Sequence, residues 1–245
     1  EICACLVGSE MCIRDSFLND LAQNLIEELQ CETVFTIPIL GGIPVSEAVV
    51  VTWIIMAVLV VVSFILTRNL KVDHISKRQA VAESIVTGLM KMVQGMVGEK
   101  GKAYVPYLTT VMLYIGVSNI IGLFGFKSPT KDLRVTVALA LMSIILIEAA
   151  GIYHKGVKRW LHGFVEPVAI VTPINILEVV TKPLSLCMRL FGNVLGAFVI
   201  MELLKMILPV GLPVVFSLYF DIFDGLLQAY VFVFLTSLYI DEITE

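Results

Sequence analysis

Long apolar segments separated by short polar ones dominate the chain after its first 47 residues. The clearest segment runs without a charge from Ala48 to Leu66, close to the roughly 20 residues that a helix needs to cross a bilayer. Residues 104–126 and 135–153 form two further apolar segments, joined by the turn-forming sequence KSPTKDLR. The pattern therefore predicts one membrane span followed by a hairpin of two more.

Two more apolar segments, 167–208 and 214–240, complete the pattern. Each is longer than one perpendicular helix requires, and excess hydrophobic length is accommodated by tilting or kinking. Pro209, Gly211 and Pro213 break the chain between them. The predicted fold class is an all-α integral membrane protein with about five membrane helices, two of them long, strongly tilted and forming a hairpin.

An amphipathic segment, 71–98, separates the first two predicted spans. Its apolar residues recur at helical spacing: Ile75, Val81, Ile85, Leu89, Met92 and Met96. This spacing predicts a helix that lies on the membrane surface. The alternative is a helix that packs on a soluble partner.

The N-terminal region differs in character from the rest. Residues 5–16 read CLVGSEMCIRDS, which looks like translated sequencing-adapter read-through. We predict that residues 1–16 are a non-native, adapter-derived segment, with an ordinary polar terminus as the alternative. Residues 17–47 are predicted to be an extracytoplasmic N-terminal segment, and residues 48–245 a single membrane domain.

Composition supports the membrane assignment and excludes other classes. Hydrophobic residues make up 58% of the chain and charged residues 16%, which leaves more apolar surface than one soluble core can bury. A net charge of −4 gives nucleic-acid binding no electrostatic basis. The five cysteines have no zinc-type spacing, and no P-loop pattern occurs. We therefore expect no cofactor, no metal and no nucleotide site.

The distribution of cations predicts the orientation in the membrane. Cations cluster around the segment after the first span and again after the third: Arg68, Lys71, Lys77, Arg78, Lys100 and Lys102, then Lys155, Lys158 and Arg159. By the positive-inside rule these sides are cytoplasmic. The N-terminus is then outside and the C-terminus inside, although Lys127, Lys131 and Arg134 lie in the opposite loop.

A polar stripe runs along the fourth span. Its members recur at steps of three and four, which places them on one side of a helix: Glu178, Lys182, Ser185, Arg189, Asn193 and Gly196. Arg189 is the deepest, and a cation there costs about 2.5–3.5 kcal/mol or more unless it faces an anion or water. Glu178 is about 16 Å away along the axis. The partner is then Asp221, Asp224 or a carboxylate on another protein, unless Arg189 only pins two helices together.

Further polar residues lie inside the other spans. Asp221, Asp224 and Gln228 repeat the helical spacing on the last span, and aspartates can take up and release protons. Alternatively, Asp221 caps a helix start and Asp224 lies in interfacial water. Asn119 and Glu148 either line an aqueous access path or hydrogen-bond a neighbouring helix.

Four sequence segments resemble one known family, and the resemblance as a whole covers about residues 34–240. The run KPLSLCMRLFGN (182–193) is similar to the signature of subunit a of F-type ATP synthases, and LLQAYVFVFLTSLYI (226–240) resembles the C-terminal helix of that family. PTKDLRVTVALAL (129–141) and the SNIIGL that contains Asn119 also fit. The resemblance implies a stator channel subunit that conducts protons through two half-channels beside a rotating ring of c subunits.

The resemblance also implies roles for single residues. The Arg that Arg189 matches faces an essential carboxylate of the ring, and the position of Gln228 lies near it. Asn193 and Asp221 match the inlet half-channel, and Glu178 matches an acidic residue toward the outlet. Some relatives have a Glu where this chain has Phe198, so the acidic role falls to Asp221 and Asp224.

The expected partners and the rival function complete the prediction. The partners are the c ring, b-type peripheral stalk subunits and the lipid of a bacterial plasma membrane, and the chain is expected to have no catalytic site of its own. Ser185, on the stripe of Arg189, is a further candidate for the access path. The rival is a self-contained secondary transporter that binds its substrate between Arg189 and the pair Asp221 and Asp224.

Overall fold

The computed structural model describes residues 33–37, 43–68, 77–124, 128–163, 172–207 and 212–244. The predicted adapter-derived segment and the residues up to 32 lie outside the described part. The helices in chain order are α2 (Glu47–Thr67), α3 (Lys77–Met96), α4 (Val105–Ile120), α5 (Leu133–Lys155), α6 (Val157–Gly163), α7 (Thr172–Ile207), α8 (Leu212–Leu218) and α9 (Gly225–Thr244). Shorter helical turns are η1 (Glu99–Tyr104), η2 (Ile121–Phe124), η3 (Pro129–Lys131) and the π-helix η5 (Tyr219–Asp224).

Five of the described helical segments are long and apolar enough to cross a bilayer. They cover Glu47–Thr67, Gly101–Leu123, Leu133–Lys155, Thr172–Met201 and Val215–Thr244. The predicted class, an all-α integral membrane protein, is confirmed. The sequence pattern did not predict a short antiparallel hairpin of β1 (Thr33–Ile37) and β2 (Ile43–Ser46), which precedes α2.

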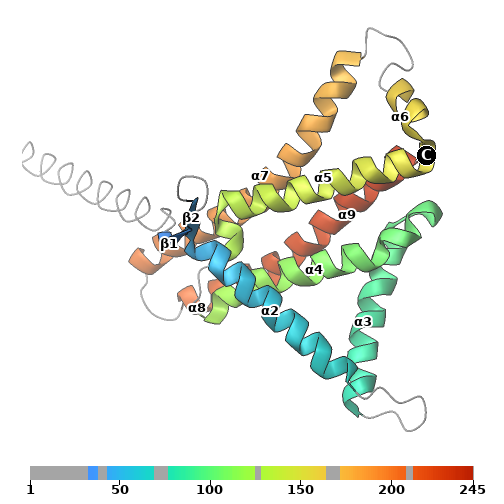
Figure 1. The fold of residues 1–245 in the computed structure, drawn as a ribbon. Helices are drawn as coiled ribbons and strands as arrows, with labels where there is room; N and C mark the ends of the chain where they lie inside the picture. Colours follow the sequence, from blue (N-terminus) through green and yellow to red (C-terminus); the bar gives the residue numbers. More distant parts are fainter. Residues whose placement is uncertain are drawn as a thin grey trace, which may run out of the picture.

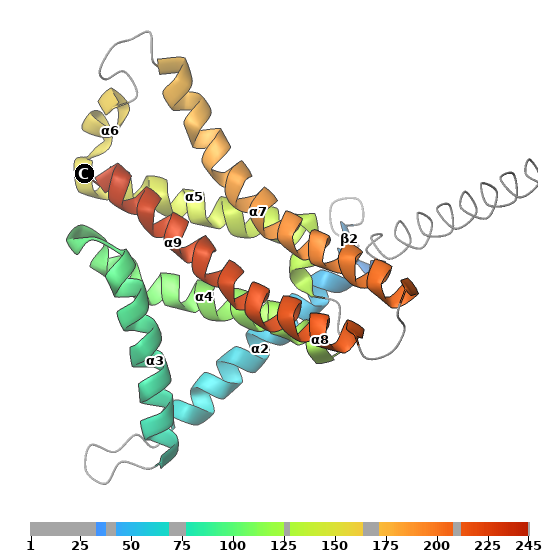
Figure 2. The ribbon, with the colours of Figure 1, turned by 180° about the vertical axis from the view of Figure 1, so that it is seen from behind.

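The spans form a central bundle with two outlying helices. α9 packs against α4 and α5, and α7 packs along α5 and α9 (Figures 1 and 2). The α7 and α9 segments form the hairpin that the proline-rich break predicted, with α8 and η5 leading into α9. α2 and α3 diverge from this bundle and meet each other at their far ends (Figure 1).

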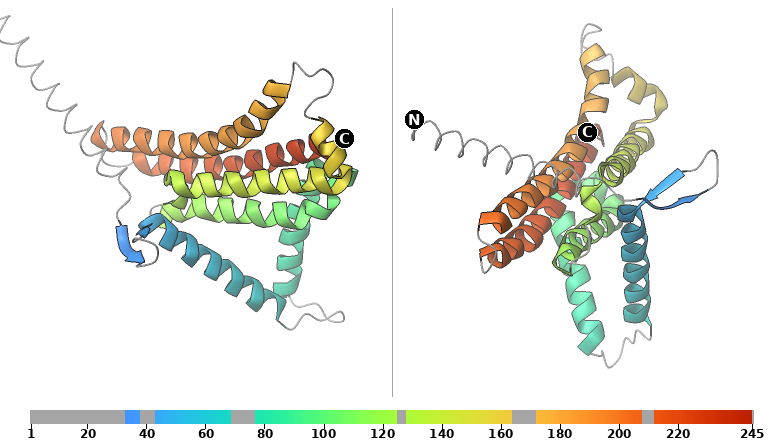
Figure 3. Two further views of the ribbon diagram at one scale, coloured as in Figure 1. Left: turned by 45° about the horizontal axis from the view of Figure 1, so that its top comes forward. Right: turned by 90° about the vertical axis from the view of Figure 1, so that its left-hand side faces the viewer.

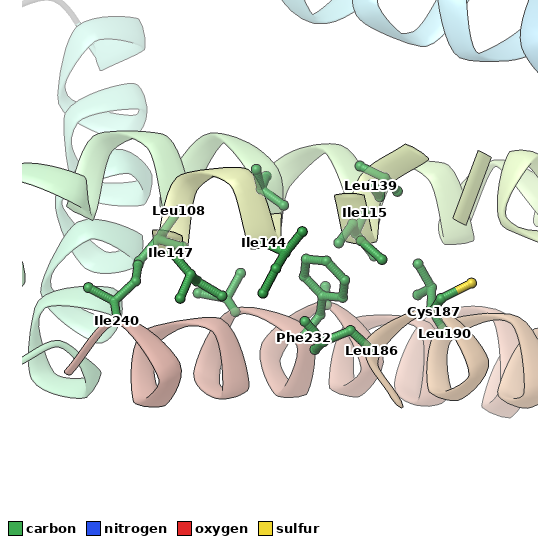
Figure 4. Packing of buried hydrophobic residues seen from close by; sticks show 14 of the residues in the cluster. Leu108, Ile115, Leu139, Ile144, Ile147, Leu186, Cys187, Leu190, Phe232 and Ile240 are labelled. Carbon is green, nitrogen blue, oxygen red and sulfur yellow. The ribbon is translucent and has the colours of Figure 1, made fainter. Parts of the chain in front are cut away.

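The core of the bundle is built from aliphatic side chains and one aromatic ring. Phe232 of α9 lies among Ile115 of α4, Ile144 of α5 and Leu186 of α7, and it is 1% exposed (Figure 4). Buried hydroxyls in α9 donate to the carbonyl four residues earlier, as Thr236 does to Phe232. No water is present in hydrocarbon to hydrogen-bond such groups, so the helix must satisfy them itself.

The outward surfaces of the spans carry many large apolar side chains. Val60 and Phe64 of α2 are 68% and 65% exposed, and Ile145 of α5 is 67% exposed. Lipid tails solvate such side chains without the cost that water imposes. The exposed apolar surface therefore fits a chain whose solvent is a bilayer.

The ends and bends of the spans follow from local chemistry. The carboxylate of Asp132 accepts a hydrogen bond from the backbone N–H of Arg134, which caps the start of α5. Gly156, with φ of 76°, ends the helix in a conformation that other residues rarely adopt. Pro183 lies inside α7, where it removes a backbone donor, and α7 is visibly bent along its length (Figure 3).

Candidate functional site

Arg189 lies on the outer side of α7, midway along the helix. Its neighbours Leu186 and Leu190 point into the bundle and are 1% and 0% exposed, whereas Arg189 itself is exposed. Leu184 and Met188 are exposed with it, so the guanidinium lies on an apolar outer surface. In the described part of the chain, Arg189 has no hydrogen bond and no ion pair.

The two aspartates that the sequence offered as partners of Arg189 do not pair with it. Asp221 accepts a hydrogen bond from Ser217 at 2.8 Å, and Asp224 is half-buried. A permanently charged guanidinium on an apolar helix surface requires an anion or water. The structure therefore leaves Arg189 available to a group from outside this chain.

Asn193 and Gln228 form the polar contact nearest to Arg189. Asn193 lies one turn beyond Arg189 on α7, and its Nδ2 donates to Oε1 of Gln228 at 2.8 Å. Gln228 is 2% exposed, and its Nε2 has no hydrogen-bond partner among the described residues. The structure thus brings together two candidate residues that the sequence placed on different spans, with Asn193 on the surface and Gln228 inside the bundle.

Asp221 and Asp224 lie on a π-helix, which corrects the α-helical spacing assumed from the sequence. The segment Tyr219–Asp224 has i to i+5 hydrogen bonding, and Gly225 N–H reaches the carbonyl of Phe220. The wider turn changes the relative directions of Asp221, Asp224 and Gln228 from those of an α-helix. Such turns are frequent at functional sites.

Three candidates for an access path have separate environments. Asn119 is buried and bonds with Thr130 at 2.8 Å and with the carbonyl of Gly225 at 3.0 Å. Glu148 accepts a hydrogen bond of 2.9 Å from the indole of Trp160 in α6. Ser185 is exposed on α7. The structure does not bring these three residues together.

Glu178 belongs to a charged cluster at the opposite end of the bundle from Asp221. Lys182 forms ion pairs with Glu178 at 3.3 Å and with Glu242 of α9 at 3.1 Å. The ammonium group also lies over the ring of Tyr239, 5.1 Å from its centroid. The cluster therefore ties α7 to the end of α9.

Several polar residues that the sequence analysis treated as a turn are buried. Thr130 is 0% exposed, and Asp132 accepts a hydrogen bond of 2.7 Å from Ser46 at the start of α2. Lys131 lies 3.8 Å from the ring centroid of Phe198. The sequence holds no signal that separates these residues from an ordinary turn, because Ser, Pro and Asp are residues that turns favour.

These features define a class: a multi-pass helical membrane protein with carboxylates and amides on its last span and, on the span before it, a cation that has no partner among the described residues. Residues 49–241 match the family model of the ATP synthase A chain. The chain belongs to this family.

Curated relatives agree with that membership. ATP synthase subunit a of Moorella thermoacetica is 35% identical over 203 residues, which cover 82% of this chain and 92% of the relative. The sodium ion specific ATP synthase subunit a of Propionigenium modestum is 35% identical over 215 residues, covering 81% and 74%. ATP synthase subunit a 1 of Crocosphaera subtropica is 30% identical over 200 residues, covering 81% and 86%.

Proposed function

We propose that this chain is the ion-conducting stator subunit of an F-type ATP synthase in a bacterial plasma membrane. The observation that carries the proposal is Arg189, exposed and unpaired in the described chain on an apolar surface of α7. A carboxylate borne by a c subunit that passes this surface would supply the missing anion. Proton conduction, with ATP chemistry left to partner subunits, is the activity that follows.

The fixed charge would act on each passing ring carboxylate in turn. A guanidinium nearby favours the ionised form of a carboxylate, so a protonated ring site must release its proton before it passes Arg189. The same charge repels protons and thereby opposes direct leakage from one side to the other. One charge crossing is worth about 2.3 kcal/mol per 100 mV, so a ring has to accumulate several crossings for each ATP.

The two half-channels are assigned to opposite ends of the bundle. Asp221, Asp224, Asn193 and Gln228 would line the inlet, and Glu178 the outlet. Asp221 and Asp224 are half-buried on η5, at the opposite end of the bundle from the Lys182–Glu178 ion pair. This separation supports an inlet at one end and an outlet at the other. Asn119, Glu148 and Ser185 remain candidates for the access path.

The proposed orientation places the C-terminus in the cytoplasm and the N-terminus outside. α3 and α6, which follow the first and third spans, gather at the end of the bundle that carries the C-terminus (Figure 3). Both helices carry more cations than anions, with Lys77, Arg78 and Lys91 in α3 and Lys158 and Arg159 in α6, as the positive-inside rule expects of the cytoplasmic side. The exposed apolar surface of α2 is left for lipid and the b-type peripheral stalk subunits.

The test is ATP-driven proton pumping by inverted membrane vesicles that carry the whole complex. Arg189→Ala is expected to abolish pumping while ATP hydrolysis by the soluble head continues. Arg159→Ala is the matched control, because Arg159 is exposed on α6, away from the α7 surface. Pumping retained by Arg189→Ala would contradict the proposed channel role.

A further inference from the structure

Both the oxygen and the nitrogen of the Asn119 side-chain amide form hydrogen bonds inside the bundle. Its Oδ1 accepts a hydrogen bond of 2.8 Å from Thr130, and its Nδ2 donates to the carbonyl of Gly225 at 3.0 Å. Asn119 is 5% exposed and Thr130 is 0% exposed. We infer that Asn119 and Thr130 are positioning residues that fix the acid-bearing π-helix η5 against α4, an inference that rests on the proposed function.

Two close contacts, one from α4 and one from η2, carry the first step. Gly225 immediately follows η5, and a Cβ built there would lie 2.7 Å from Cβ of Asn119. Before the end of η5, Asp221 approaches Gly122, where a Cβ would lie 3.2 Å from its Oδ1. Asn119 and Gly122 are three residues apart, so the end of α4 and the start of η2 contact Gly225, directly after η5, and Asp221 within it.

The orientation of the Asn119 amide determines what Thr130 must do. The carbonyl of Gly225 can only accept, so the NH₂ group of Asn119 faces it and Oδ1 faces Thr130. Thr130 must then donate its hydroxyl proton. The Ser128 hydroxyl lies 2.7 Å from the same hydroxyl, and its single proton can go either to Thr130 or to the carbonyl of Ser118.

A π-helix needs such external support more than an α-helix does. It is rare and occurs mostly as a single turn within other helices, so neighbouring contacts decide where the extra residue is accommodated. A shift of this turn by one residue would redirect Asp221 and Asp224 relative to Gln228. Fixing Gly225 through Asn119 prevents that shift and keeps the carboxylates in register with the surface of Arg189.

Thr130 separates this inference from direct ion contact by Asn119. If Asn119 itself lined the ion path, removal of the Thr130 hydroxyl would leave its amide present and ion flow nearly intact. If Asn119 positions η5, Thr130→Val removes the donor that orients the amide and impairs coupling. Thr130→Ser keeps the hydroxyl donor, so coupling in that variant should resemble coupling in the unaltered chain.

The first measurement is ATP-driven pumping by vesicles that carry the whole complex, normalised to the amount of this chain. Thr130→Val is expected to reduce pumping roughly fivefold, the effect of losing one buried hydrogen bond, and Thr130→Ser to restore it. Thr110→Val is the matched control, because the Thr110 hydroxyl is exposed and donates within its own helix to the carbonyl of Pro106. Equal pumping by Thr130→Val and Thr110→Val would overturn the inference.

A second measurement reports the position of η5 without using transport. Cysteines introduced as Gly122→Cys and Asp221→Cys lie at a close contact, so mild oxidation in the assembled complex should join them, as detected by mass spectrometry. Adding Thr130→Val should slow this cross-link several-fold, while Thr110→Val should not. If Thr130→Val leaves the cross-linking rate unchanged, the positioning role is overturned, even if Arg189→Ala abolishes pumping. If the cross-linking rate falls, the positioning role is supported, even if the proposed channel function fails its own test.

Discussion

The side-chain amide of Asn193 donates a hydrogen bond of 2.8 Å to Oε1 of Gln228, and this bond joins α7 to α9 one turn from Arg189. The two ends of the bond differ in environment, because Asn193 is exposed whereas Gln228 is buried. Nε2 of Gln228 already lacks a partner in the described chain. The exposed Asn193 therefore supplies a hydrogen bond that the buried amide of Gln228 needs.

This asymmetry predicts unequal effects of replacing the two residues. Asn193→Ala removes the only described donor to Oε1 of the buried Gln228 amide. We expect it to destabilise the chain by about 1–3 kcal/mol. Gln228→Leu removes the buried polar group and should cost less. In the Gln228→Leu background, Asn193→Ala should be nearly silent.

The measurement is the thermal unfolding midpoint of the chain in detergent-solubilised complex, for the two single variants and the double variant. Additive shifts would contradict the contact. Stability is the appropriate readout, because both residues are also proposed to line the inlet half-channel.

A second prediction concerns the close approach of α4 and α9. Gly225→Ala would place a Cβ 2.7 Å from Cβ of Asn119, a distance that requires one helix to move. We expect a loss of about 1–3 kcal/mol and less chain in the membrane. Gly88→Ala is the control, because nothing lies within 4 Å of a Cβ at that exposed position in α3. It should be neutral or slightly stabilising, and an equal loss in both variants would contradict the packing argument.

The sequence predicted the spans and the polar stripes because both depend on local periodicity. An uncharged run such as Ala48–Leu66 has one stable arrangement in a bilayer, and steps of three and four place Arg189 beside Asn193 on any α-helix. The contact of Asn193 with Gln228 was not derivable in this way. It depends on the packing of α7 against α9.

What the sequence did not predict depends on non-local contacts. The π-helix at Tyr219–Asp224 has no sequence signature separate from the apolar segment around it, so α-helical spacing was assumed for Asp221 and Asp224. Thr130 was interpreted as part of a turn, and only the fold places it against Asn119. The β1–β2 hairpin is short and was likewise not predicted.

A third prediction concerns the junction of α2 and α5. Asp132 is 5% exposed, and its carboxylate accepts two hydrogen bonds. One comes from the backbone N–H of Arg134 and caps α5, and the other comes from the Ser46 hydroxyl. Asp132→Ala loses both bonds and should cost about 1–2 kcal/mol for the cap alone. Asp132→Asn keeps an acceptor for the cap and can donate to Ser46, so it should retain most of the stability. Equal thermal midpoints for the Ala and Asn variants would contradict this account.

A fourth prediction separates ion conduction from simple charge pairing at the outlet. Glu178 and Glu242 both pair with Lys182, and their side chains are similarly exposed, 47% and 56%. In each ion pair the carboxylate is the exposed partner. Glu178→Gln and Glu242→Gln should therefore each change the free energy of unfolding by less than about 1 kcal/mol. Under the proposed outlet role, Glu178→Gln should lower pumping about tenfold, roughly 1.4 kcal/mol in rate, while Glu242→Gln should not. Equal pumping by the two variants would assign Glu178 to charge pairing alone.

The last prediction tests whether another helix passes the outer surface of α7. Gly192 lies three residues after Arg189 and is exposed, and a Cβ there would meet no described atom within 4 Å apart from its chain neighbours and its own helix backbone. Gly192→Leu should therefore leave the thermal stability of the chain unchanged, because leucine suits a helix and meets no neighbour here. In the complex, the added side chain should obstruct the close approach that small residues allow between membrane helices and lower ATP-driven pumping about tenfold. Gly88→Leu, at an open position on α3, controls for the added bulk. Because a Cβ is unobstructed at both positions, a pumping defect confined to Gly192→Leu would indicate a partner at the surface of Arg189. Normal pumping by this variant would place the ring elsewhere.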